Sequence, residues 1–295
     1  MTTAAIPATE APKKQPLRIA RILVYVGLIA LALFYLIPIY VLVSTSLKSY
    51  ADVSLDRMWQ FPQHLTLAGF AAAWSGDPLK GQQGLGGNFF NSVKLVIPAL
   101  FISVMLGSLN GYALSHFKFR GADILFFLML FGMFIPYQSV MIPLVRVEQF
   151  LGLYGSIPGL VLAHVVYGLP ITTLIFRNYY AGIPHDLIEA ARIDGAGLLG
   201  IYRRIIVPIS APGMVVAIIW QFTQIWNDFL FGVIITNKPS VQPITVALNN
   251  LAGSFIVQWN VQMAGALLTA LPTVIVYILM GRYFVQGLMA GSVKG

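Results

Sequence analysis

Polar side chains recur at helical spacing in an apolar stretch of the last third of the chain. Gln221, Gln224 and Asp228 are spaced i, i+3, i+7, which places them on one stripe of a helix. Trp226 and Asn227 lie beside that stripe. Amide and carboxylate groups bind sugar hydroxyls, and aromatic rings pack against the apolar faces of sugars. Because polar groups that face lipid are costly, the stripe predicts a surface that faces a polar substrate.

The same stripe has a second interpretation, in which its side chains form hydrogen bonds between helices, worth about 0.6 kcal/mol each. In a helix that starts at Ala211, Asp228 lies about 25 Å along the axis, near the outer membrane interface, where it can pair with an external loop. His164 and Tyr167, spaced i, i+3, either face the same path or satisfy each other's hydrogen bonds. The sequence leaves both interpretations open.

Motifs for catalysis, metal binding and nucleotide binding are missing from the sequence. The chain has no cysteine, which removes thiolate nucleophiles and thiolate metal ligands. Its four histidines are scattered, without the H-E-x-x-H spacing, and no G-x-x-x-x-G-K-[ST] loop occurs. We therefore expect no catalytic residue, no metal and no cofactor, and we expect any ATP to be bound by another chain.

The composition indicates whether the chain lies in water or in lipid. Hydrophobic residues make up 58% and charged residues 9%, against about 25% charged residues in soluble domains, and the mean hydropathy is +0.79. The sequence thus predicts an all-α membrane protein. Stretches near the length of about 20 residues that a membrane span needs predict six transmembrane helices, near 22–46, 92–115, 122–143, 157–180, 211–236 and 263–283. Pro136 and Pro170 predict kinks in the third and fourth helices.

The distribution of Lys and Arg predicts the orientation. The connections on one side of the six spans hold twice as many of them as those on the other side, and the richer side faces the cytoplasm. Both termini and the connection between the fourth and fifth spans are therefore expected inside. Most of the net charge of +8 reflects this topology, with no reason to invoke nucleic acid. Residues 1–17 are expected to form a disordered tail, and 18–295 a single transmembrane domain.

That cytoplasmic connection is charged and punctuated by glycine: "EAARIDGAGLLGIYRRIIVPISAPG" covers Glu189 to Gly213. Gly195 can end a first short helix in the left-handed conformation, and a second short helix is predicted from about residue 198 to 206. Two short helices at an angle form a projection that fits into a partner. Alternatively, they form an amphipathic hairpin with Arg203 and Arg204 on anionic headgroups.

The spacing within this loop resembles the EAA signature of the membrane subunits of bacterial ABC importers, with Val207 where the signature has leucine. The resemblance implies that the loop is the coupling helix that docks into an ATPase cleft. The residues it implies for that coupling loop are Glu189, Ala190, Ala191, Asp194, Gly195, Ile205 and Pro208.

The resemblance to ABC importer subunits extends over most of the chain. "MFIPYQSVMIPL", "IWQFTQIWNDFLFG", "QPITVALNN" and "RYFVQGLMAGSVKG" look like segments of maltose-permease-like carbohydrate importers, most like the second permease of glucose/mannose-type systems. The resemblance implies a subunit of the bacterial cytoplasmic (inner) membrane that passes a monosaccharide or small oligosaccharide and catalyses no reaction itself. Its implied partners are a second permease, two ATP-binding subunits and an extracytoplasmic sugar-binding protein.

The connection between the fifth and sixth spans resembles, by position, the loop that enters the binding protein's cleft in the maltose system. That resemblance implies a binding-protein contact at Gly253, Ser254 and Phe255, presented by a short helix over "ITVALNN" that ends near Asn250. An ordinary interfacial helix and turn, anchored by Trp259, is the other interpretation. The alternative function is a secondary transporter without an ATPase, for which only Asp228 offers an ion-binding carboxylate.

Overall fold

The computed structural model describes residues 19–77, 82–117, 119–252 and 257–292. The tail predicted over 1–17 and the predicted binding-protein contact at Gly253, Ser254 and Phe255 lie outside these ranges. The regular secondary structure of the described chain is helical apart from two short antiparallel strands, β1 (Gly76–Asp77) and β2 (Gln82–Gln83).

Four helices are long and apolar enough to cross a membrane as single spans, and two bent helix pairs raise the number of candidate spans to as many as six. The four are α1 (Ile19–Ser46), α3 (Gly86–His116), α6 (Ile157–Tyr180) and α13 (Trp259–Ser292). The bounds of α6 match the predicted fourth span. Pro170 lies inside this helix, which continues past it.

The third predicted span, 122–143, is two helices rather than one. α4 (Ala122–Met133) ends before Pro136, and η4 (Tyr137–Val140) and α5 (Met141–Phe150) follow at 94° to it. Pro136 disfavours a helical conformation at the residue before it and cannot donate a backbone hydrogen bond. With 12 residues, α4 covers roughly 18 Å and is shorter than the hydrocarbon core of about 30 Å.

The fifth predicted span, 211–236, is also interrupted. α10 (Ala211–Trp226) ends at Asn227, and the short helix α11 (Leu230–Ile235) follows. The side-chain amide of Asn227 donates to the carbonyl of Thr223 (3.0 Å), and a carboxylate oxygen of Asp228 accepts from the backbone N–H of Gly232 (3.2 Å). Side chains of Asn and Asp compete in this way with the backbone hydrogen bonds of a helix. Asp228 therefore lies after the end of α10 and not on the helical stripe predicted from the sequence.

α3 and α6 are packed together at the level of their backbones. A Cβ at Gly111 would lie 2.6 Å from the Cβ of Phe176, and one at Gly107 would collide with Thr172. The hydroxyl of Thr172 donates to the carbonyl of Ser103 on α3 (3.2 Å). Small residues at such contacts allow membrane helices to approach closely, and the result is a tightly joined α3–α6 pair.

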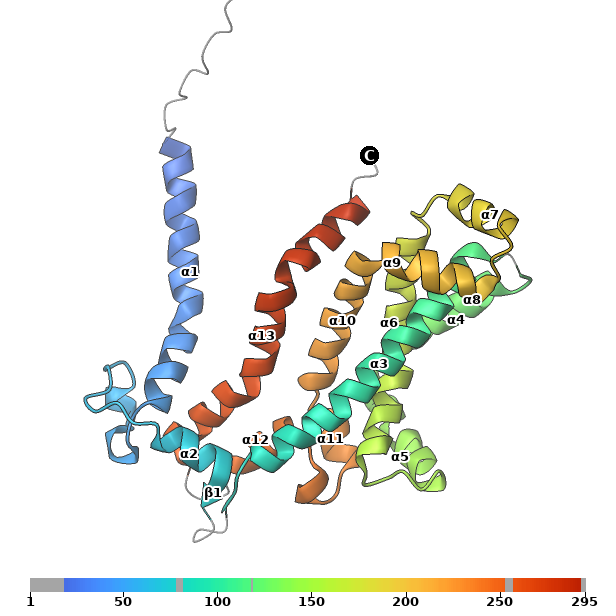
Figure 1. Ribbon diagram of the computed structural model, residues 1–295. Helices are drawn as coiled ribbons and strands as arrows, with labels where there is room; N and C mark the ends of the chain where they lie inside the picture. The colour runs from blue at the N-terminus through green and yellow to red at the C-terminus, as the bar shows by residue number, and fades with distance from the viewer. Residues whose placement is uncertain (1–18, 78–81, 118, 253–256, 293–295) are drawn as a thin grey trace, which may run out of the picture.

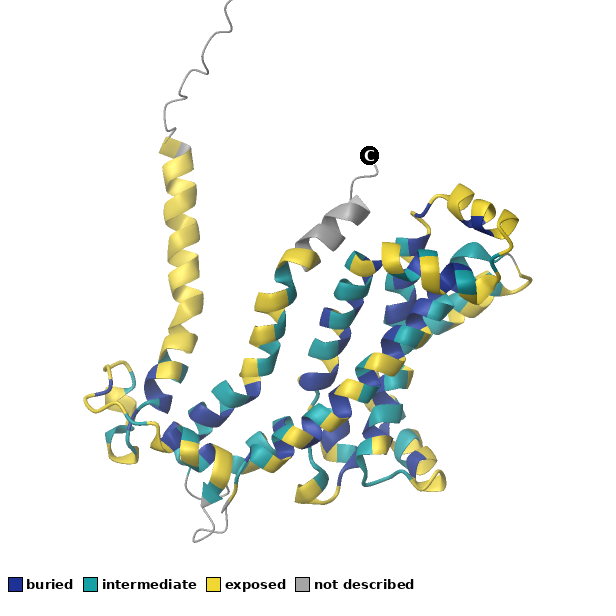
Figure 2. Cartoon of the chain, in the orientation of Figure 1, coloured by how far each residue is buried: buried dark blue, intermediate teal, exposed yellow. Residues whose placement is uncertain are grey.

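α1 stands apart from the other long helices over most of its length and approaches them only near its C-terminal end (Figure 1). None of the most apolar part of this helix is buried, and Figure 2 shows the helix exposed on all its visible faces. The segment that follows α1 contains η1 (Tyr50–Asp52), η2 (Leu55–Arg57) and α2 (Ala68–Ser75).

The ends of the helices define two sides of the molecule. The N-terminal end of α1 and the C-terminal end of α13 lie on the same side as α7 (His185–Ile193) and α8 (Leu198–Ile201), whereas α2, β1 and α12 (Ile244–Leu251) lie on the opposite side (Figure 1). α12 covers the short helix expected over "ITVALNN". η6 (Pro239–Val241) precedes it.

Candidate functional site

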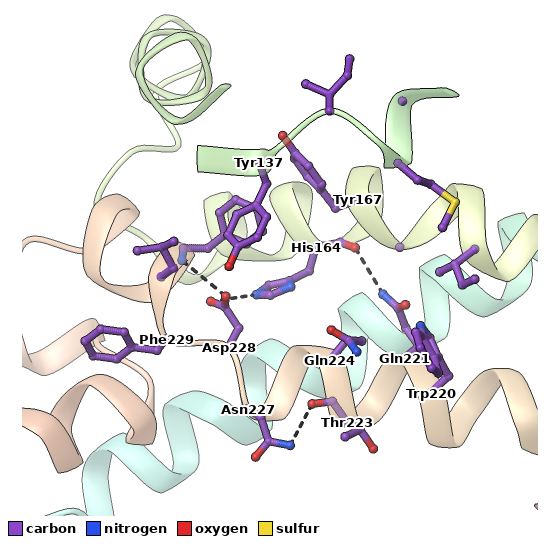
Figure 3. Close-up of a pocket in the computed structure, with 17 residues that line it drawn as sticks. Tyr137, His164, Tyr167, Trp220, Gln221, Thr223, Gln224, Asn227, Asp228 and Phe229 are labelled. Carbon is purple, nitrogen blue, oxygen red and sulfur yellow. Dashed lines mark hydrogen bonds and ion pairs between the residues drawn. The ribbon is translucent and has the colours of Figure 1, made fainter. Parts of the chain in front are cut away.

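A cavity of about 690 Å³ lies where the two interrupted spans meet α6. Its wall includes residues from the end of α4 and from η4, from the middle of α6, and from the end of α10 and the start of α11. Figure 3 shows side chains from these segments pointing toward a common space. The cavity is therefore built at two helix breaks.

The polar groups of the cavity come mostly from the end of α10. Gln224 and Asn227 are exposed, and both line the cavity together with Thr223 and Asp228. Asn227 donates one amide N–H to the Thr223 carbonyl. The side chain of Gln224 forms no hydrogen bond with another described residue. The amides of Gln224 and Asn227 are thus the groups best placed to bind a polar solute.

Asp228 connects three segments at the edge of the cavity. Its carboxylate accepts from the backbone N–H groups of Phe231 (3.5 Å) and Gly232 (3.2 Å), at the start of α11. Its Oδ2 lies 3.6 Å from Nε2 of His164 on α6, and its backbone carbonyl accepts from the Thr245 hydroxyl of α12 (2.5 Å). A histidine within the bundle thus lies within ion-pair distance of Asp228, but too far away for a hydrogen bond (Figure 3).

Aromatic rings form one wall of the cavity. The ring of Phe231 lies 5.1 Å from that of Tyr167, 5.4 Å from that of His164 and 5.7 Å from that of Tyr137, measured between centroids. His164 and Tyr167 were predicted to face this path, whereas Tyr137 and Phe231 were not. Their signal was present in the quoted segments "MFIPYQSVMIPL" and "IWQFTQIWNDFLFG", which bracket the two helix breaks.

Gln221 lies mainly in the helix packing. Its side chain is 2% exposed, and its Nε2 donates to the Ser103 hydroxyl and to the His164 carbonyl, both at 3.3 Å. Gly168 on α6 leaves the space that this side chain fills. Gln221 contributes only part of its surface to the cavity wall, and its hydrogen bonds join α3, α6 and α10.

Trp226 lies away from the cavity, contrary to its predicted place in the substrate path. Its indole N–H donates to the Thr269 carbonyl on α13 (2.8 Å), and its ring packs against Phe89 (5.4 Å) and Phe222 (5.8 Å). Two residues along a helix rotate the side chain by about 200°, so Trp226 points away from Gln224 and belongs to the core.

The loop between α6 and α10 forms a second candidate site. α7 and α8 are followed by η5 (Tyr202–Ile206), which is π-helical, and α9 (Val207–Ile209). Gly195 has φ +81°, the left-handed conformation expected at the end of the first short helix. Space is open where its side chain would be.

The coupling-loop residues divide between the two faces of this loop. Ala191 is buried against the α3–α6 pair, and Ile205 is half-buried. The exposed face carries Glu189, Ala190, Asp194, Gly195 and Pro208, together with apolar side chains such as Ile193, which is 86% exposed. The structure therefore leaves four signature residues of α7 and its C-terminal turn exposed: Glu189, Ala190, Asp194 and Gly195.

The chain matches known transport proteins over most of its length. A family model described as binding-protein-dependent transport system inner membrane component matches residues 88–289. A probable ABC transporter permease of Pyrococcus horikoshii is 44% identical over 93% of this chain and 98% of the relative. An osmoprotective compounds uptake permease of Synechocystis is 35% identical, over 92% and 91%. A xylose/arabinose import permease of Haloferax volcanii is 34% identical, over 86% and 87%.

A solved structure has the same fold. In a bacterial ABC transporter that imports the acidic polysaccharide alginate, one chain superposes with a TM-score of 0.80 at 23% identity, covering 93% of this chain and all of that one. Family membership sets aside the secondary transporter considered from the sequence. The chain belongs to the family of inner-membrane components of binding-protein-dependent transport systems and is a membrane permease subunit of an ABC importer.

Proposed function

We propose that this permease subunit passes a sugar, a monosaccharide or a small oligosaccharide, through the cavity at the two helix breaks. The observation that carries the proposal is the composition of that cavity: its lining combines the exposed residues Gln224 and Asn227, which carry amides, with aromatic residues that include Tyr167 and Phe231. Amides pair with hydroxyl groups, and aromatic rings pack on the apolar face of a sugar ring. The xylose/arabinose permease among the relatives supports the same substrate class.

The proposal includes the partners that such a subunit requires. The energy comes from two ATP-binding subunits on the cytoplasmic side, where both termini of the chain also lie, and the sugar is delivered by an extracytoplasmic binding protein. A second permease completes the passage. The exposed apolar surface of α1 supports an assembly in which this helix contacts another membrane chain or lipid. The predicted contact of Gly253, Ser254 and Phe255 with the binding protein is part of this proposal.

The exposed face of the loop between α6 and α10 is the proposed docking surface for an ATP-binding subunit. Its support is the grouping of Glu189, Asp194 and Gly195 on one exposed face with exposed apolar side chains such as Ile193 and Leu199. Exposed apolar residues next to charges are typical of protein contacts. The opposite face of this loop is buried against α3 and α6. This packing holds the docking surface in place relative to the helix bundle.

The test is purification of the chain with the proteins that it binds, followed by ATPase and uptake assays in liposomes with a panel of pentoses, hexoses, disaccharides and osmoprotective solutes. We expect an ATP-binding chain to co-purify, and we expect one group of sugars to stimulate hydrolysis and to be taken up. Uptake that needs no ATP-binding chain would contradict the ATPase partner, and stimulation by a non-sugar solute alone would contradict the substrate class.

A further inference from the structure

Three buried hydroxyl groups meet where the cytoplasmic loop joins the helix bundle. Oγ of Ser108 on α3 lies 2.6 Å from the hydroxyl oxygen of Tyr180, the last residue of α6, and 2.8 Å from that of Tyr202, the first residue of η5. The exposed fractions of the three residues are 0%, 0% and 3%. We call Ser108, Tyr180 and Tyr202 the hydroxyl cluster; its hydrogen bonds connect three separate segments.

The surroundings of the hydroxyl cluster are mostly apolar, and the buried hydroxyl of Ser210 lies close to that of Tyr180 as a further polar group. Ile188 of α7, Ile201 of α8 and Ile206 of η5 are buried in the same core as Phe176 of α6. A hydroxyl group in such surroundings loses free energy unless it is paired, so the three groups hold one another in place. The inner face of the loop is therefore attached to α3 and α6 by polar bonds of defined direction as well as by apolar packing.

The backbone at the cluster is unusual. Tyr202–Ile206 is π-helical between two α-helical turns, and Pro208 lacks the N–H that a regular helix would use there. Single π-helical turns are less stable than α-helix and occur often at functional positions. Here the wider turn brings the hydroxyl of Tyr202 to Ser108 while the neighbouring Arg203 stays exposed.

From the cluster, the tightly joined α3–α6 pair continues to the cavity. Ser108 lies next to Gly107, whose Cβ position is occupied by Thr172 of α6. One turn of α6 before Thr172, Gly168 contacts Gln221 and lines the cavity. α3 and α6 touch at backbone level along this path, so few side chains between them can rearrange. A displacement at the hydroxyl cluster therefore also moves the wall of the cavity.

We infer that the hydroxyl cluster is a coupling element, with Tyr202 as a positioning residue that transmits movement of the loop to the α3–α6 wall of the cavity. This inference rests on the proposed function, in which an ATP-binding subunit moves the loop. Without the bonds to Ser108, the loop still docks and the ATP-binding subunit still hydrolyses ATP, but the loop shifts relative to α3 and α6 instead of moving them.

The test uses the purified complex and a reporter in the cavity. Because this chain has no cysteine, Ile171→Cys on α6 provides its single thiol on the cavity wall. Labelling of that thiol by a maleimide is compared without nucleotide and after trapping with ATP and orthovanadate. We expect trapping to change the labelling rate in the parent complex. In Tyr202→Phe, we expect that change to fall about fivefold while ATP hydrolysis persists, since the lost bonds hold the loop in register. Ser108→Ala should give the same result.

Tyr112→Phe is the matched control. The Tyr112 ring packs against that of Tyr202 (5.6 Å between centroids), but its buried hydroxyl has no hydrogen-bond partner among the described residues. This variant should keep the parent response, whereas a general effect of removing a buried hydroxyl would appear in it too. Thermal unfolding of each complex checks that the variants are folded.

Three results would overturn the inference: a parent-like labelling response in Tyr202→Phe, an equal loss in Tyr112→Phe, or a cavity thiol in the parent that does not respond to trapping. Absence of a co-purifying ATP-binding chain would instead contradict the proposed function. Tyr180→Phe combined with Tyr202→Phe adds a further check, because residues that act through Ser108 as one unit give a non-additive loss.

Discussion

The imidazole of His164 lies 3.6 Å from the carboxylate of Asp228, which joins the middle of α6 to the break between α10 and α11. The same carboxylate accepts from the first backbone N–H groups of α11, where a negative charge is stabilising. This side chain therefore helps to fix the position of α11 and of the Phe231 ring that it carries into the cavity.

Replacing Asp228 separates its two roles. Asp228→Ala should destabilise the subunit by about 1 kcal/mol, the usual cost of losing a helix cap, and should reduce uptake because the cavity wall loosens. Asp228→Asn keeps an oxygen for the α11 N–H groups and should retain most of the stability. Thermal unfolding of the purified complex measures the difference, and equal midpoints for the two variants would contradict the capping role.

Gln221 and Gln224 form a matched pair on one helix, three residues apart, with different surroundings. Gln224→Leu should lower the affinity for sugar by roughly 1–3 kcal/mol, the cost of leaving a sugar hydroxyl unpaired, with unfolding unchanged. Gln221→Leu should instead lower the unfolding temperature, because the bonds to Ser103 and His164 are lost. Uptake kinetics and thermal unfolding of both variants test this assignment, and a reversed pattern would refute it.

Gly195 tests the proposed docking surface. Gly195→Val places a branched side chain at φ +81°, a left-handed conformation that costs roughly 1–2 kcal/mol, and should misplace the end of α7. Gly195→Asn is the control, since Asn visits this conformation more readily. We expect transport to fall strongly for valine and mildly for asparagine, with the permease still inserted in the membrane.

Glu189 tests the charge on that surface. Its carboxylate is exposed and lies 3.7 Å from Nε2 of His185 within α7. Glu189→Lys should abolish sugar-stimulated ATP hydrolysis without unfolding the subunit, because a surface charge contributes little to stability. The assay compares hydrolysis and co-purification of the ATP-binding chain, and full stimulation in the variant would exclude a docking role for Glu189.

Gly111 tests the joining of α3 to α6. Gly111→Ala puts a methyl group 2.6 Å from the Cβ of Phe176, and such overpacking costs typically about 1–3 kcal/mol. Gly281→Ala on α13 is the control, because no atom of the described residues outside its own helix backbone lies within 4 Å of the added Cβ. Unfolding of the two variants should differ by that amount, and equal stability would show that the two helices can separate at no cost.

The sequence predicted regular helices well and interruptions poorly. The span over 157–180 has the bounds of α6, because hydropathy and length alone define it. The ends of α4 and α10 depend on competing local bonds: the Asn227 amide to the Thr223 carbonyl and the Asp228 carboxylate to α11. Hydropathy carries no information about such bonds. The predicted stripe therefore included Asp228, although α10 ends before this residue.

The candidate sites show the same division. His164, Tyr167 and Gln224, which the sequence placed on one path, line the same cavity, because helical spacing holds inside α6 and α10. Their role in binding substrate stays a prediction. Trp226, placed beside the same stripe, lies outside the cavity lining and is buried against α13, because its angle on the helix differs from that of Gln224. Tyr137 was missed, since the turn that brings it beside Phe231 follows from the break at Pro136 and not from any period in the sequence.

The two helix breaks also place the cavity part-way along a helix that is long enough to span a membrane. Irregular backbone at membrane depth occurs where it is buried in protein or lines water, and the cavity reaches along α6 from His164 to Ile171, roughly 10 to 21 Å from its first residue. Beyond Ile171, only about 14 Å of α6 remains before Tyr180. If sugars pass through this cavity as proposed, a solute that enters from the end of α6 at Ile157 and reaches Ile171 has therefore passed more than half of the length of that helix.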